Sequence, residues 1–144
     1  MRPHPLVDAI ADLFLRPGHA PAREEMDSAH RARIRFEWVS GQWVLLAPDN
    51  KFHGWMSWYR CTDAILVLLR AGRIAALVAR ANPDDLTRGP HLYIATAVVA
   101  PRAPPGTYRA LFRLVCNANP DARVIVAQLH KRDGRQRALV RRLH

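Results

Sequence analysis

Apolar residues near the start of the chain recur at the spacing of an amphipathic helix. Pro5 suits the first turn of a helix, where its missing N–H has no partner, and five apolar residues then share one face: Leu6, Val7, Ile10, Leu13 and Phe14. This pattern predicts a helix from about 5 to 15. The run Arg16–Pro21, with two prolines and a glycine, ends that helix and places His19 in a loop. Helix-forming residues from Ala22 to about Arg31 predict a second helix.

The period then changes to the alternation that is typical of strands. Positions 34, 36 and 38 are apolar while 35 and 37 are charged, Ser40-Gly41 suits a turn, and 43–46 is rich in β-forming residues. Together these segments predict a hairpin. An aromatic-rich strand is expected over His53–Tyr59, ending near Thr62-Asp63, a pair typical of a helix start.

The second half of the chain alternates between helical and strand patterns. Residues 63–70 predict a short helix that stops at Gly72, 74–78 continue the helical region, and the apolar run 91–100 predicts the central strand. A Pro-rich connector precedes a helix expected over 107–116, and strands at 124–129 and 138–140 form a closing hairpin around Asp133-Gly134. We therefore expect an α+β fold with a mixed, mostly antiparallel central sheet flanked by helices, in a single domain over 1–144.

Composition supports a folded, cytoplasmic protein. The chain has 144 residues, of which 49% are hydrophobic and 24% charged, as in globular domains with one core. No apolar run approaches the roughly 20 residues that cross a bilayer, and the first residues do not have the pattern of a signal peptide. Cys61 and Cys116 are the only cysteines, which predicts reduced thiols in small core positions.

The net positive charge of the chain favours anionic partners. Lys and Arg number 22 against 12 Asp and Glu, for a formal charge of +10. Such a field attracts nucleic acid, an acidic carrier protein or the phosphates of a coenzyme, and charge alone does not choose among them. Candidate anion-binding residues gather near the C-terminus: Lys131, Arg132, Arg135, Arg137, Arg141 and Arg142. A solvated surface is the alternative for this group. The histidines and cysteines show no metal-ligand spacing, so no metal site is predicted.

The predicted order of elements is that of the GNAT acetyltransferase superfamily, and three local motifs point further. They are Leu45-Leu46-Ala47-Pro48-Asp49-Asn50 followed by Trp55-Met56-Ser57-Trp58, Gly89 before Leu92-Tyr93-Ile94, and Val98-Val99-Ala100-Pro101 before a helix. Through these motifs the stretch from Leu45 to Arg135 resembles the bacterial toxin-activating lysine acyltransferases. The resemblance implies a GNAT-like fold and transfer of a fatty acyl group from acyl carrier protein to a lysine.

The resemblance also implies residues of an active site. The family's catalytic histidine lies in a loop after its first helix, where Arg16-Pro17-Gly18-His19 offers His19. The family's catalytic aspartate on the central strand corresponds here to Ala97. Since alanine cannot orient or charge-stabilise an imidazole, either another acid substitutes for it or the chain is not the same enzyme.

Two further groups of residues are candidates for acyl transfer. GNAT proteins bind pyrophosphate at the loop before the helix that follows the central strand, and the candidate cofactor-binding residues there are Arg102, Gly106, Thr107 and Arg109. A simple helix entry is the alternative. Candidate residues of an acyl groove are Ser57, Trp58 and Tyr93, with packing in the core as the alternative for the aromatic rings.

Two functions from different classes are therefore open. The first is an acyltransferase without a permanently bound cofactor, which uses an acyl thioester of acyl carrier protein or coenzyme A, His19 as base and a protein lysine as acceptor. The second is a non-catalytic basic accessory or virion-type protein that binds nucleic acid or a protein partner, a function that Ala97 motivates. A homodimer is compatible with both.

Overall fold

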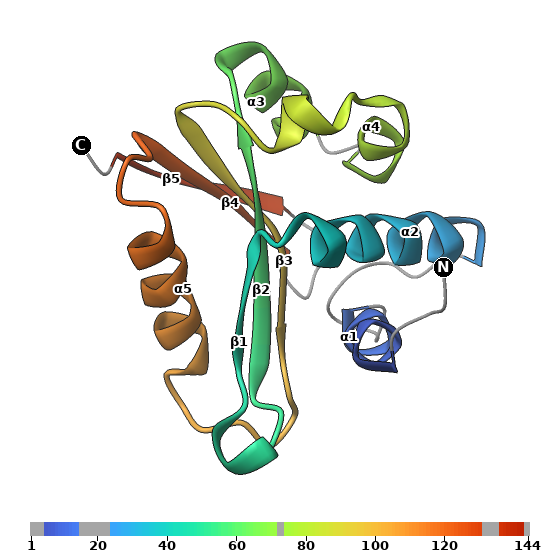
Figure 1. Ribbon diagram of the computed structural model, residues 1–144, viewed down its shortest axis with the longest axis vertical. Helices are drawn as coiled ribbons and strands as arrows, with labels where there is room; N and C mark the ends of the chain where they lie inside the picture. The colour runs from blue at the N-terminus through green and yellow to red at the C-terminus, as the bar shows by residue number, and fades with distance from the viewer. Residues whose placement is uncertain (1–4, 15–23, 72–73, 131–135, 143–144) are drawn as a thin grey trace.

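The computed structural model describes residues 5–14, 24–71, 74–130 and 136–142 (Figure 1). In chain order the helices are α1 (Pro5–Phe14), α2 (Glu24–Ser40), α3 (Asp63–Arg70), α4 (Ile74–Arg80) and α5 (Thr107–Ala118). The strands are β1 (Trp43–Leu46), β2 (Gly54–Cys61), β3 (His91–Val99), β4 (Val124–His130) and β5 (Gln136–Arg142), and short 3-10 helices span Pro48–Asn50 and Pro83–Leu86.

The strands form one sheet in the order β1-β2-β3-β4-β5. β3 and β4 are parallel, whereas the other neighbouring pairs are antiparallel. The predicted α+β class is thus confirmed, and β3 is the central strand of a mixed, mostly antiparallel sheet. In Figure 1, α5 lies on one side of the sheet, α1 and α2 lie on the other, and α3 and α4 lie at the top. None of the described helices combines the length and apolarity that crossing a membrane requires.

The two faces of the sheet carry separate apolar clusters. On the α5 face, Met56 and Ile94 of the sheet are buried against Leu111 of the helix. On the other face, one cluster surrounds Trp55 and includes residues of α1 and α2, and a second surrounds Tyr59 and includes residues of α3 and α4. Between Trp55 and Tyr59 on β2 lies Ser57, so a polar residue separates the two clusters.

The predicted hairpin of 34–38 with 43–46 is wrong. α2 continues to Ser40, and the strand partner of 43–46 is β2. The alternation of apolar residues fits a helix here because its two flanks pack in different clusters: Ile34 and Trp38 pack around Trp55, whereas Phe36 packs around Tyr59. The charged residue between them, Glu37, is buried as well, whereas a half-exposed strand would have placed it in solvent.

The remaining predicted elements correspond to elements of the structure, although the second helix, expected from Ala22 to about Arg31, extends to Ser40. The helices expected at 5–15, 63–70 and 107–116 correspond to α1, α3 and α5, and the region 74–78 lies in α4. The closing hairpin is formed by β4 and β5, which pair from Val124 with Arg142 to His130 with Gln136. The expected helix stop at Gly72 and the turn at Asp133-Gly134 lie outside the described residues.

Candidate functional site

A β-bulge in β3 lies at the centre of the candidate site. β2 pairs Ser57 with Thr96 and then Trp58 with Ile94, which leaves Ala95 as an extra residue on β3. A bulge interrupts the ladder and bends the strand, and bulges are frequent next to functional sites. The carbonyl of Ala95 and the hydroxyl of Thr96 both meet side chains of α2, so the bulge opens toward the helix that packs on this face.

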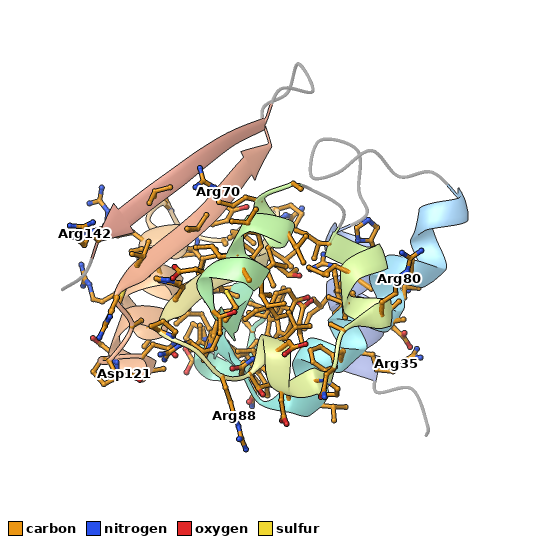
Figure 2. All side chains as sticks on the ribbon, turned by 90° about the horizontal axis from the view of Figure 1, so that it is seen from above. Arg35, Arg70, Arg80, Arg88, Asp121 and Arg142 are labelled. Carbon is orange, nitrogen blue, oxygen red and sulfur yellow. The ribbon has the colours of Figure 1, made fainter. Side chains whose placement is uncertain are left out.

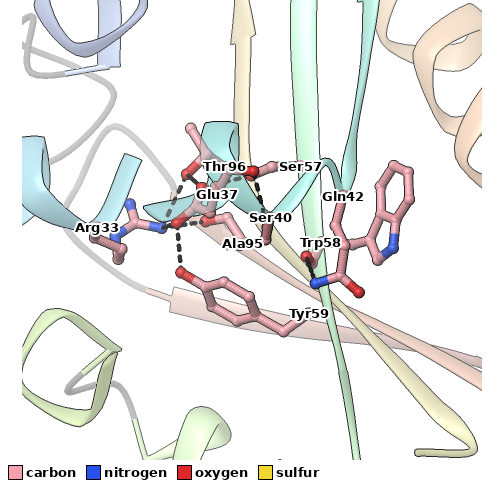
Figure 3. Close-up of polar contacts among 9 residues, drawn as sticks. All are labelled: Arg33, Glu37, Ser40, Gln42, Ser57, Trp58, Tyr59, Ala95 and Thr96. Atoms are coloured by element: carbon pink, nitrogen blue, oxygen red, sulfur yellow. Dashed lines mark hydrogen bonds and ion pairs between the residues drawn. The ribbon is translucent and has the colours of Figure 1, made fainter. Parts of the chain in front are cut away.

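Glu37 of α2 is the hub of a buried hydrogen-bond network (Figure 3). Its Oε1 accepts from Ser57 Oγ at 2.5 Å and from Thr96 Oγ1 at 2.6 Å. Its Oε2 accepts from Arg33 Nη1 at 2.9 Å and from the Tyr59 hydroxyl. A carboxylate has about four acceptor positions, and these four donors fill them. We call Arg33, Glu37, Ser57, Tyr59 and Thr96 the Glu37 network.

Arg33 joins the network to the bulge. Its Nη1 lies 2.9 Å from Thr96 Oγ1 and 3.0 Å from the carbonyl oxygen of Ala95, in addition to its contact with Glu37. Arg33 and Glu37 are four residues apart, which puts them on one face of α2, and they are 2% and 0% exposed. The guanidinium therefore supplies a donor to the carbonyl of the bulged residue and a counter-ion to the carboxylate, and both interactions hold the bulge in place.

Burial fixes the protonation of the groups around Glu37. Burial lowers the pKa of the Arg33 guanidinium, but the charge of Glu37 and the neighbouring tyrosines outweigh burial, so that pKa lies above its ordinary value. Burial, followed by the charge of Glu37, raises the pKa of Tyr59 well above its ordinary value. Burial also raises the pKa of Tyr93, whose ring stacks on Tyr59 at 6.4 Å between centroids. Neither the guanidinium nor the two phenols therefore exchange a proton near neutral pH.

β3 and β4 stop pairing where the bulge begins. Their ladder ends at Ile94 with Ala127, although β3 continues to Val99 and β4 to His130. Figure 1 shows the two strands separating beyond this point. The lower half of β3 therefore has β2 on one side and, within the described part of the sheet, no ladder partner on the other. A strand edge without a ladder partner is the kind of element to which an extended ligand can bond as an added strand.

The start of α5 lies just after this half of β3. Gly106 precedes the helix with a φ of 88°, a left-handed conformation that glycine adopts without strain. Thr107 is buried and its hydroxyl donates to the Pro104 carbonyl at 2.6 Å, whereas Arg102, Gly106 and Arg109 are exposed. Three of the four predicted cofactor-binding residues are thus open to solvent, and Thr107 is bonded within the connector. Their binding role stays a prediction.

The three predicted groove residues do not share one face of the sheet. Trp58 is buried in the cluster under α5. Ser57 points to the opposite face and donates to Glu37, and Tyr93 stacks on Tyr59 on that same face. The Tyr93 hydroxyl is buried and has no hydrogen-bond partner within the described part of the chain. The structure thus places Ser57 and Tyr93 on one face of the sheet and Trp58 on the other.

The residues that the resemblance implies for catalysis are placed only in part. His19 lies outside the described residues, so its role stays a prediction. Ala97 packs in the cluster under α5, on the face of β3 opposite the Glu37 network. Glu37 is a buried carboxylate close to β3, but its four acceptor positions are filled. It therefore does not offer an imidazole the acceptor that Ala97 lacks.

The predicted anion-binding residues near the C-terminus are also placed in part. Lys131, Arg132 and Arg135 lie outside the described residues. Arg137 lies on β5, and Arg141 and Arg142 are exposed at the end of this strand. Figure 2 shows further arginines on other segments, with the labelled ones spread around the molecule: Arg35, Arg70, Arg80 and Arg88. Positive charge is therefore distributed over several elements as well as the closing hairpin.

The two cysteines are free and unequal in exposure. Cys61 is buried and Cys116 is partly buried. Burial raises the pKa of Cys61 to about 12, so its side chain is a neutral thiol at neutral pH. In the described segments, no three His, Cys, Asp or Glu side chains are grouped as metal ligands would be.

Arg33 and Glu37 were missed from the sequence alone. Opposite charges four residues apart are the signal of an ion pair on one helix face. That signal was hidden because residues 34–38 were predicted as a strand, in which 33 and 37 also share a face but on the solvent side.

Comparison with known proteins identifies no family for this sequence. The sequence matches no protein family, and a search among curated proteins also finds no match. The bulge, the separated strands and the charges around them are therefore the features that bear on function.

Proposed function

We propose that this protein is an acyltransferase that moves an acyl group from a thioester to a lysine side chain. The observation that carries the proposal is the separation of β3 from β4 beyond Ile94, directly before α5. A phosphopantetheine arm is extended and contains amide groups, so it can bond to an open strand edge as an added strand does. Acyl carrier protein and coenzyme A both present their acyl group on this arm.

The charges near α5 support the same ligand. Arg102 and Arg109 are exposed around the start of the helix, whose N-terminal N–H groups also favour negative charge. The phosphate at the far end of the arm would meet these groups when the thioester lies along β3. The formal charge of +10 favours an acidic carrier protein as donor, because it accelerates the encounter between the two proteins.

The proposed reaction needs a base and a well-placed thioester. The neutral lysine amine attacks the thioester carbonyl, a C–N bond forms, the C–S bond breaks, and the amine proton passes through the base to the departing thiolate. His19 is the proposed base, because imidazole titrates near neutral pH. It also occupies the sequence position of the catalytic histidine in the family that the chain resembles. The Glu37 network contributes by holding the bulge, since none of its groups has a proton or an acceptor position to spare.

Thioester consumption tests the proposal directly. The full chain is incubated with fatty acyl carrier protein or fatty acyl-coenzyme A and a lysine-containing protein, and released thiol and acylated lysines are measured. We expect His19→Ala to lower the rate at least about 100-fold. His53→Ala, which removes another loop imidazole, is the matched control and should leave the rate unchanged. If the unmodified chain consumes neither donor, the proposal is wrong.

A second function is favoured by two described positions on and next to β3, Ala97 and Glu37, neither of which offers an imidazole a free carboxylate. Ala97 has no acid group and Glu37 has no free acceptor position, so the scaffold would serve as a basic accessory protein if His19 has no other orienting acid. Arg141 and Arg142, exposed at the end of β5, would then bind nucleic acid or an acidic protein surface. Replacing both by Gln should weaken binding to a DNA duplex and reduce its salt dependence. Arg88→Gln, also exposed but on another segment, is the control, and binding that ignores salt contradicts this function.

A further inference from the structure

We propose that two copies of this protein associate through the exposed face of α3, antiparallel and about a two-fold axis. The helix, DAILVLLR, is apolar on every side between its charged ends. One side packs on the sheet: Leu69 is buried, and Ile65 and Leu66 contact the same cluster. On the other side Val67 is 68% exposed and Leu68 is 50% exposed. A helix that is apolar all round is normally covered all round, and in a single copy this face is uncovered.

The exposed residues have the spacing of a coiled-coil seam. Ala64, Val67 and Ala71 are all exposed and follow one another at intervals of three and four residues, with Leu68 beside them. This is the pattern of core positions in a two-stranded coiled coil, here over two turns. Alanines at both ends of the seam permit close approach of a second helix, and Val67 lies at its middle.

Two charged residues beside the seam identify the occupant. Asp63 and Arg70 are seven residues apart, so they lie on the same flank of the helix in successive heptads. When two identical helices pack antiparallel, equal flanks face each other, and Asp63 of each copy lies opposite Arg70 of the other. A parallel pair would instead place Asp63 next to Leu68 of the second copy. This self-complementarity fits a second copy of the chain in an isologous contact.

The surroundings of the two charges are compatible with this contact. The Asp63 side chain is 94% exposed; it contacts His91 through one oxygen, and a carboxylate has room for further donors. Arg70 is exposed in the last turn, and its guanidinium, with five N–H donors, has room for this carboxylate beside its interaction within its own chain. Together the two residues are neutral, in a chain whose formal charge is +10. A second copy therefore meets less repulsion here than at the arginine-rich parts of the surface.

The size of the contact sets its strength. A helix of eight residues is about 12 Å long, and two such helices bury less than the roughly 800 Å² per partner of a standard stable interface. We therefore expect a weak dimer, with a dissociation constant of roughly 10 µM to 1 mM.

A charge exchange tests the antiparallel arrangement. Sedimentation equilibrium of the full chain over about 10 µM to 1 mM should show a monomer–dimer equilibrium. Asp63→Arg places two cations opposite each other in both contacts, and Arg70→Asp places two anions there, so each variant alone should dimerise at least about 10-fold more weakly. A mixture of the two variants restores both opposite-charge pairs and should form a heterodimer. Val67→Asp, at the centre of the seam, should abolish dimerisation.

Two results would show that the α3 face is not a dimer contact: a chain that stays monomeric over the whole concentration range, and a dimer that Val67→Asp leaves intact. If the mixed charge variants fail to form a heterodimer, the antiparallel arrangement is wrong. A non-specific apolar contact would show no difference in association between the single variants and their mixture. Circular dichroism checks that each variant is folded, which we expect because all three positions are exposed. Thioester consumption is measured separately, so a failure of the proposed function does not affect this result.

Discussion

The two faces of the central sheet are stabilised by different kinds of contact. Under α5, Met56, Ile94 and Leu111 are buried in an apolar layer. Under α2, an ion pair between Arg33 and Glu37 is buried within a set of hydrogen bonds. Both layers rest on β2 and β3, so the strands alternate between the two environments along their length.

This difference shows what buried charge does that apolar packing does not. Apolar contact has no direction, and an apolar layer tolerates changes that conserve volume. The Glu37 carboxylate, in contrast, requires four donors at fixed positions, and two of them, Ser57 and Thr96, are opposite each other on β2 and β3. The network therefore specifies the register of the strands on both sides of Ala95, whereas the layer under α5 contributes mainly stability.

Removal of the hub carboxylate should have the largest effect. Glu37→Ala leaves the Arg33 charge buried without its counter-ion and three hydroxyls without their acceptor. We expect it to lower the free energy of unfolding by about 3–5 kcal/mol, measured by urea denaturation. Since this loss approaches the whole stability of a small domain, Tyr59→Phe provides a milder variant that removes one donor and should cost about 1–2 kcal/mol.

An exposed ion pair on the same side of the molecule provides the control for Glu37. Arg31 and Asp12 form an ion pair in which the Asp12 side chain is 65% exposed. Asp12→Ala should cost less than about 1 kcal/mol, because water replaces the lost partner. A loss for Glu37→Ala as small as that for Asp12→Ala would contradict the distinction between the two faces.

A cavity on the α5 face should have the next largest effect. Leu111 is 0% exposed, and Leu111→Ala removes packing without leaving a polar group unpaired. We expect a loss of about 2–4 kcal/mol in the free energy of unfolding. Leu114→Ala, on the same helix but 37% exposed, should cost less than about 1 kcal/mol. The strands should keep their register in Leu111→Ala, which amide chemical shifts of 94–97 can show; a shifted register there would contradict the roles assigned to the two faces.

The contrast between apolar packing and the buried polar network also explains which parts of the fold could be predicted from the sequence. The apolar period alone predicted α1, α5 and the central strand, because their buried positions follow simple rules of spacing. It failed at 34–38, where a helix packs apolar side chains on both flanks and buries Glu37 between them. The bulge at Ala95 leaves no trace in a run of apolar residues, and three of the four donors to Glu37 come from β2 and β3, which are distant from α2 in the sequence. The site could not be assembled from spacing because its contacts join residues up to 63 positions apart.

The cysteines, one on each face, give the smallest and most local comparison. Cys61 belongs to the cluster around Tyr59, and Cys116 packs beside the layer under α5. Burial is the main cause that raises both pKa values, and it raises the pKa of Cys61 from 9.0 to about 12. At pH about 8, a thiol reagent should therefore modify Cys116 of the folded chain first and reach Cys61 only through unfolding.

The raised pKa of Cys61 also predicts how stability depends on pH. The unfolded chain ionises this thiol near 9.0 and the folded chain near 12, so the unfolded state loses its proton first as pH rises. The stabilising contribution is complete below pH 9.0 and is lost progressively up to about 12. Urea denaturation should show a steeper loss of stability across this range for the unmodified chain than for Cys61→Ala. Other groups, such as Tyr59, contribute equally to both proteins, so equal slopes would show that Cys61 is ionised in the folded chain and that this side of the sheet is less closed than its burial indicates.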